Sequence, residues 1–136
     1  MNELVLIDAH VHLHPCYDLG SSLDWAATNL GAAASNGSTA AWTGVLMLTE
    51  HDQATRYPEL AACAAHREAV GRWRLEPTTE AQSLIARRDD GATLVIVAGR
   101  QIVTVEKLEV LALATMQTFS DGQTLAHAVA AAQAAG

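Results

Sequence analysis

An apolar strand that runs directly into two histidines opens this chain, and it constrains the fold more than any other feature of the sequence. The run Leu4–Asp8, apolar up to its last residue, is typical of a β-strand buried on both faces. Side chains two residues apart on a strand share a face, so Asp8, His10 and His12 are expected together at its carboxyl end. In α/β barrels this end carries the active site. We therefore expect His10 and His12 to bind a divalent metal ion; the alternative is a polar loop whose histidines only make hydrogen bonds.

Strands and helices alternate through the first half of the chain. A helix is expected over 21–34, and a second buried strand over 42–49. Pro58 suits the first turn of a further helix over 59–70. This order of strand, helix, strand and helix is that of a parallel α/β unit.

The second half of the chain changes to antiparallel signals. Asp90-Gly91 is a strong hairpin turn, so the apolar runs on either side of it are expected to pair antiparallel. The expected elements are a short strand over 73–76, hairpin strands over 83–86 and 93–98, a second hairpin over 102–104 and 108–114, and an Ala-rich helix over 124–135.

The second strand also ends in polar residues. If the first two strands are neighbours, His51 reaches the same rim as the first two histidines and supplies a third metal ligand. Glu50 or Asp52 would orient or deprotonate a water; alternatively, Asp52 caps the helix that follows. Asp18, in the loop after the first strand, is a further candidate metal ligand or else a turn residue.

Composition and charge exclude several classes of protein. The net charge is −7 and the eight Lys and Arg residues are scattered, so no patch for nucleic acid is expected. Cys16 and Cys63 are too far apart to suggest a disulfide scaffold or a structural zinc site. Neither a signal peptide nor an apolar run of about 18 residues is visible, which predicts a cytoplasmic protein without a membrane span.

The polar motifs resemble those of the polymerase and histidinol phosphatase (PHP) family. The family's D-x-H-x-H motif matches residues 8–12, and its T-D-H motif resembles residues 49–51. Its later segment G-x-E…H-V-L-A-L resembles residues 99–113. The resemblance implies a distorted (βα) barrel that binds two or three zinc, manganese or iron ions and hydrolyses phosphate esters.

The resemblance also implies a set of metal ligands, with two departures. Gln101 stands where the family has a bridging Glu, and Glu109 stands where it has a His. An amide keeps an acceptor oxygen but cannot bridge two cations as a carboxylate does. The positions that this resemblance assigns to the metal site are His10, His12, Asp18, His51, Gln101 and Glu109.

Length limits how much of such a barrel this chain can form. A full α/β barrel needs about 200 residues or more, and this chain has 136. The expected fold is therefore a single α/β domain over 1–136, a partial (βα) barrel of PHP type with an inserted antiparallel hairpin region. We expect it to be completed by a missing C-terminal half or by a homo-oligomer.

Three functions follow from this pattern. The first is a metal-dependent phosphoesterase acting on a small-molecule phosphate ester. The second is an amidohydrolase-type enzyme, which residues 7–12 would also suit, although many such enzymes use a carboxylated lysine and Lys107 lies in an expected turn. The third is a non-catalytic metal-binding or regulatory module whose site has decayed, which Gln101 favours.

Overall fold

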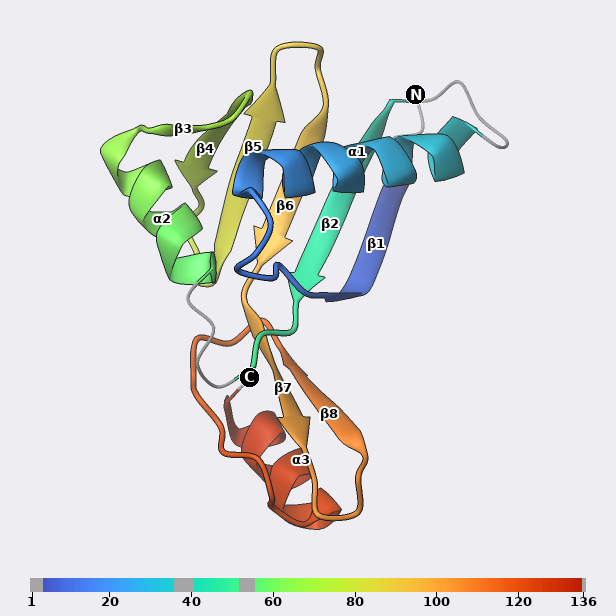
Figure 1. Cartoon of the computed structure of the whole chain (residues 1–136), viewed down its shortest axis with the longest axis vertical. Coiled ribbons are helices and arrows are strands. Elements are labelled where there is room, and N and C mark those ends of the chain that lie inside the picture. Colours follow the sequence, from blue (N-terminus) through green and yellow to red (C-terminus); the bar gives the residue numbers. More distant parts are fainter. Residues whose placement is uncertain (1–3, 36–40, 52–55, 136) are drawn as a thin grey trace.

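The computed structural model describes residues 4–35, 41–51 and 56–135, and its main part is an open six-stranded sheet (Figure 1). The strands lie in the order β1-β2-β6-β5-β4-β3. Their bounds are Leu4–Val11 for β1, Trp42–Leu48 for β2, Ala69–Val70 for β3, Trp73–Pro77 for β4, Ser83–Arg88 for β5 and Thr93–Val97 for β6. The first three strands in this order are parallel, and the others pair antiparallel.

The predicted partial (βα) barrel of PHP type is wrong. The hairpin of β5 and β6 is not an insertion but the middle of the sheet, because β6 pairs with β2 on one side and β5 on the other. The turn at Asp90-Gly91, where Gly91 has a φ of +92°, reverses the chain, so β5 pairs antiparallel with β6. The six strands form an open sheet from β1 to β3. A barrel needs parallel strands that are each followed by a helix, and the described residues form only three helices.

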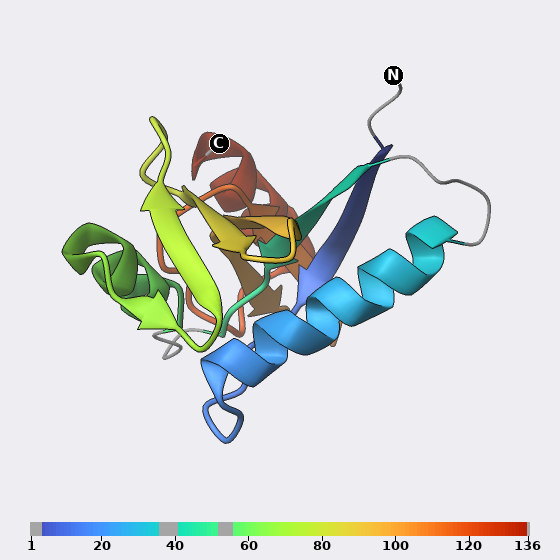
Figure 2. The same cartoon turned by 90° about the horizontal axis from the view of Figure 1, so that it is seen from above.

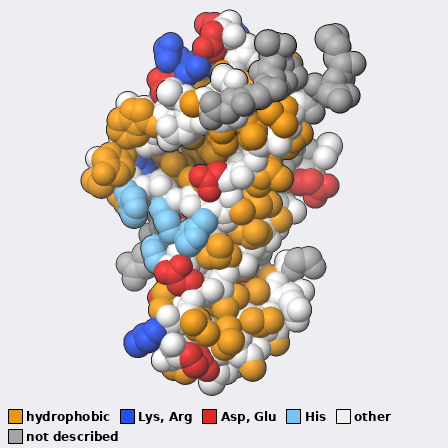
Figure 3. Space-filling view, turned by 90° about the vertical axis from the view of Figure 1, so that its right-hand side faces the viewer, with side chains coloured by type: hydrophobic (Ala, Val, Ile, Leu, Met, Phe, Trp, Pro, Cys, Tyr) orange, Lys and Arg blue, Asp and Glu red, His pale blue; other side chains and the backbone are white. Residues whose placement is uncertain are grey.

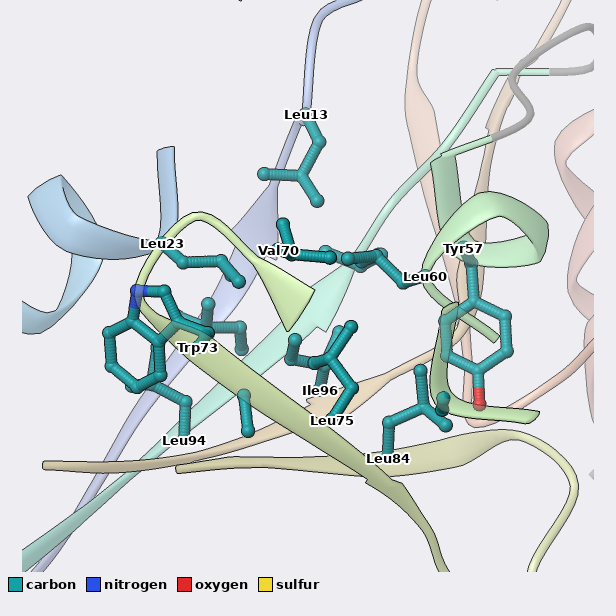
Figure 4. Packing of buried hydrophobic residues seen from close by; sticks show 14 of the residues in the cluster. Leu13, Leu23, Tyr57, Leu60, Val70, Trp73, Leu75, Leu84, Leu94 and Ile96 are labelled. Atoms are coloured by element: carbon teal, nitrogen blue, oxygen red, sulfur yellow. The ribbon is translucent and has the colours of Figure 1, made fainter. Parts of the chain in front are cut away.

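Helices α1 (Leu19–Ser35) and α2 (Arg56–His66) lie on the same face of this sheet, as the view from above shows (Figure 2). They bury a leucine-rich core in which the indole of Trp73 and the phenol ring of Tyr57 are the largest side chains (Figure 4). Alternate residues of the strands supply the sheet side of this core, as the period of a strand requires. Its buried leucines and isoleucine are Leu13, Leu23, Leu46, Leu48, Leu60, Leu75, Leu84, Leu94 and Ile96.

Strand β1 is an edge strand and is not buried on both faces, contrary to the prediction. Val5 and Ile7 are 54% and 61% exposed. Ile7 is in register with Val45, whereas Asp8 is in register with the buried Leu46, so Ile7 points to the face of the sheet that the helices leave uncovered. A continuous apolar run does not reveal whether a strand lies at the centre or at the edge of a sheet.

A network of charged groups ties α1 to strands β4 and β5. The Asp24 carboxylate accepts hydrogen bonds from the indole N–H of Trp73 at 3.0 Å and from Arg88 at 2.7 Å, and it pairs with Arg72 at 3.2 Å. Burial alone would raise the pKa of Asp24, but the hydrogen bonds from these three partners outweigh burial and hold that pKa below its ordinary value. The network therefore holds the first half of α1 against β4 and β5.

The end of the chain forms a smaller unit beneath the large sheet (Figure 1). It comprises β7 (Gly99–Val103), β8 (Glu109–Leu113) and α3 (Leu125–Ala135), packed on one another around Ile102 and Phe119. Glu50 joins it to the large sheet, because the Glu50 N–H donates to Gly99 O and the Gln101 N–H donates to Glu50 O. This junction brings β7 and β8 beneath the ends of β1 and β2. None of the described helices has the length and apolar character needed to cross a membrane.

Candidate functional site

An irregularity at the end of β1 presents the histidines. The pairing of β1 with β2 shifts register between Asp8 and Val11, and the Asp8 carboxylate accepts the backbone N–H of His10 at 3.2 Å. A bulge of this kind redirects the side chains that follow it. Its result here is that the side chains of His10 and His12 lie together, with their Nε2 atoms 3.1 Å apart. Histidine side chains form a patch on one face of the molecule (Figure 3).

Three side chains lie close to the ring of His10, and two of them come from a distant part of the sequence. Its Nε2 lies 3.1 Å from His12 Nε2 and 3.1 Å from the Oε1 of Gln101, a buried residue of β7. The carboxylate of Glu109, on β8, lies 3.9 Å from the same nitrogen. The structure therefore gathers the residues of the first motif and of the 99–113 segment at one place.

Stacked rings extend this group of donors across the rim. The rings of His12 and His51 are 5.3 Å apart and 11° from parallel, and those of His12 and His14 are 5.8 Å apart and 24° from parallel. His51 reaches the rim from the end of β2, which confirms that the neighbouring strands bring it to the first two histidines. We call His10, His12, His14 and His51 the histidine cluster.

The surroundings of His12 favour the neutral form of its ring. Burial is the largest cause that holds the pKa of His12 below its ordinary value. Protonated His10, His51 and His14 would repel a proton on His12 and lower its pKa further, whereas the carboxylate of Glu109 acts in the opposite direction. A neutral imidazole is the form that binds metal ions.

Two acids predicted to act at the site are engaged elsewhere. The Glu50 side chain is buried, and its carboxylate accepts the backbone N–H groups of Arg56 at 3.0 Å and Tyr57 at 3.4 Å, at the start of α2. Asp18 accepts the backbone N–H of Ser21 at 2.8 Å and so caps α1; this hydrogen bond lowers the pKa of its carboxyl. The predicted catalytic residue Asp52 lies outside the described residues.

The donor set at His10 is chemically suited to a cation. Across the described ranges, no three His, Cys, Asp or Glu side chains are grouped as metal ligands would be; the third donor beside His10 and His12 is the amide oxygen of Gln101. His10 Nε2 lies at the same distance from His12 Nε2 and from Gln101 Oε1. A single N–H on His10 that was shared between these two atoms would give neither of them a full hydrogen bond. Two nitrogens bound to a tetrahedral zinc ion are about 3.3 Å apart, close to the separation observed here.

Three residues that the sequence did not single out adjoin the cluster. Tyr17 lies 6.3 Å from the ring of His14 and 5.9 Å from that of Trp25, and both Tyr17 and Trp25 are more than half exposed. Trp25 lies about 200° around the helix from the buried Leu23 and therefore faces away from the core. Helical periodicity would have revealed this. The guanidinium of Arg56 donates to the carbonyl of Tyr17 at 2.5 Å and so holds the loop in place.

Comparisons of this chain with family models, with curated proteins and with solved structures found no match. The evidence for a function is therefore the geometry of the histidine cluster and its neighbours.

Proposed function

We propose that the rim at the ends of β1 and β2 binds a divalent metal ion and that the protein uses this ion to hydrolyse phosphate esters. The observation that carries the proposal is the position of His10 Nε2, which lies 3.1 Å from both His12 Nε2 and Gln101 Oε1. The sequence resemblance to PHP phosphoesterases supports the reaction class, and it rests on the motif residues alone.

His10, His12 and Gln101 would hold the ion. Two imidazole nitrogens and an amide oxygen suit zinc, manganese or iron. The His51 ring stacks on His12 and so fixes the orientation of the His12 ring, as residues around a metal site commonly do. When bound, the ion would polarise a phosphoryl oxygen and lower the pKa of water to near ~7.

Glu109 is the carboxylate best placed to accept a proton from a water at this rim. It lies 3.9 Å from His10 Nε2, and about half of its side chain is exposed. Glu50, by contrast, is committed to the first turn of α2. We therefore assign the general base to Glu109 in place of Glu50.

A metal-binding module without turnover is the second candidate, and Gln101 favours it. A neutral amide does not bridge two cations, so the rim would hold a single ion. Loss of a second ion weakens the stabilisation of both the attacking and the leaving oxygen.

Hydrolysis of bis(p-nitrophenyl) phosphate tests the proposal. The protein is stripped with chelator, reloaded with zinc, manganese or iron(II), and compared with the His10→Ala, His12→Ala double variant. The matched control is the His66→Ala, His127→Ala double variant, which removes two exposed histidines from α2 and α3. We expect metal-dependent turnover in the wild type and the control and none in the first variant. Metal binding without turnover would establish the second candidate, and equal turnover in all three proteins would contradict both.

A further inference from the structure

A groove runs beside the histidine cluster, between the end of β1 and the exposed side of α1. Its volume is about 460 Å³, within the range of about 300–1,000 Å³ that is usual for small-molecule sites. Asp8 lines it from β1, His12 and Tyr17 from the loop that follows, and Trp25 and Asn29 from α1. We call it the α1 groove. His12 belongs both to this groove and to the histidine cluster, so a ligand in the groove would extend to the rim.

One wall of the α1 groove is aromatic. Trp25 is 56% exposed and Tyr17 is 51% exposed, and their rings meet edge to face at 5.9 Å with an interplanar angle of 84°. Neither ring contributes to the buried core. Exposed aromatic side chains that border a concave site commonly supply a flat face on which a ring of the ligand can stack.

The other lining groups are polar and carry few partners. Among the described residues, the Asp8 carboxylate accepts one hydrogen bond, from the backbone N–H of His10. Within the described part of the chain, no hydrogen-bond partner is found for the side-chain amide of Asn29 or for the hydroxyl of Tyr17. The groove thus offers an acceptor in Asp8 and both donors and an acceptor in Asn29. A ligand ammonium group only donates, so it cannot pair with the N–H groups of the Asn29 amide. A ligand hydroxyl both donates and accepts, so it can pair with both residues.

We propose that the α1 groove binds the alcohol part of the substrate and that this part is a ring bearing hydroxyl groups, as in a sugar phosphate. The ring would stack on the indole face of Trp25 with Tyr17 beside it, and its hydroxyls would bond to Asp8 and Asn29. The phosphate would then lie at the histidine cluster on the far side of His12. This inference rests on the proposed function for the position of the phosphate, but not for binding of the ring.

Indole N–H signals of the metal-free, ¹⁵N-labelled protein test the ring site separately from the metal site. Trp25 lines the groove, whereas Trp73 is fully buried and serves as an internal control. Titration with methyl glucoside is expected to shift the Trp25 signal to saturation and leave that of Trp73 unchanged. Methyl phosphate and tetramethylammonium are expected to shift neither signal.

Variants test the assignment of the two walls. Trp25→Ala, followed by calorimetry, and Asn29→Leu, followed by the Trp25 signal, are each expected to weaken methyl glucoside binding at least about tenfold, or about 1.4 kcal/mol. Leu108→Ala removes a similarly exposed apolar side chain from the distant β7–β8 hairpin and is expected to bind as the wild type does.

Absence of a saturable Trp25 shift with methyl glucoside would overturn the inference, and so would a shift with tetramethylammonium in its place. Undiminished binding by both groove variants would also overturn it. A protein that binds no metal but gives the expected Trp25 shift would contradict the proposed function and leave the ring site standing.

Discussion

The ends of β1 and β2 lie side by side in the parallel part of the sheet, and each carries a histidine close to an acid. At the end of β1, the His10 side chain is nearly half exposed, and its Nε2 lies near His12, just after β1, and Gln101 on β7. At the end of β2, the Glu50 side chain is buried and turned to the N-terminus of α2, while the His51 ring stacks on that of His12. Similar residues therefore have different surroundings at the two ends.

The helix that follows each strand explains the difference. Asp18, in the loop after β1, caps α1, so the acids at that rim are not needed for this purpose. Glu50 is itself the acceptor for the first backbone N–H groups of α2. Unpaired N–H groups at a helix start attract carboxylates strongly. An acid at a strand end is thus available for chemistry only where another residue caps the next helix.

Replacing Glu50 should produce the largest change in stability. Glu50→Ala leaves two N–H groups of α2 without their acceptor in a buried setting, and we expect a loss of about 1–3 kcal/mol in the free energy of unfolding. Urea unfolding measures this loss, and zinc titration should show an affinity close to that of the wild type. A Glu50→Ala variant that is fully stable but no longer binds metal would contradict this, because it would make Glu50 a metal ligand and not a helix cap.

Replacing Gln101 tests the metal site at the end of β1. Gln101→Glu exchanges a neutral amide for a carboxylate beside His10, and we expect zinc or manganese to bind at least roughly tenfold more tightly, or about 1.4 kcal/mol. Gln101→Leu, which has no donor atom, should bind more weakly than the wild type. Calorimetric titration distinguishes the three proteins, and equal affinities would remove Gln101 from the site.

A smaller effect is expected from pH in the metal-free protein. The pKa of His12 is lower in the folded state than in the unfolded chain, where it is about 6.5. Its contribution to stability is therefore complete above about pH 6.5 and is lost as pH falls toward the folded-state pKa. Urea unfolding between about pH 5 and pH 7.5 should show this loss in the wild type and a shallower one in His12→Asn. His66→Asn, on the exposed side of α2, should follow the wild type.

The parts of the structure that short-range signals encode were predictable from the sequence. The apolar runs predicted strands, and Asp90-Gly91 predicted the β5–β6 hairpin. The spacing of His10 and His12, together with His51, predicted that these histidines meet at the ends of β1 and β2. The parallel pairing of β6 with β2 was not predictable, because it joins segments far apart in the chain and turns a supposed insertion into the centre of the sheet.

The roles of the acids were not predictable either. Whether Asp18 and Glu50 bind metal or cap helices depends on where α1 and α2 begin in space, which a residue type does not reveal. Gln101 and Glu109 came from the family resemblance, and the structure brings both to His10. The exposed faces of Tyr17 and Trp25 depend on which side of α1 packs on the sheet.

Metal stoichiometry after equilibrium dialysis tests the central claim most directly. The protein is dialysed against zinc and then against metal-free buffer, and the bound metal is measured by mass spectrometry. The proposed site predicts about one ion per chain in the wild type and in the His66→Ala, His127→Ala control, and none in the His10→Ala, His12→Ala variant. Equal metal content in all three proteins, or none in the wild type, would contradict the assignment of this rim as a metal centre.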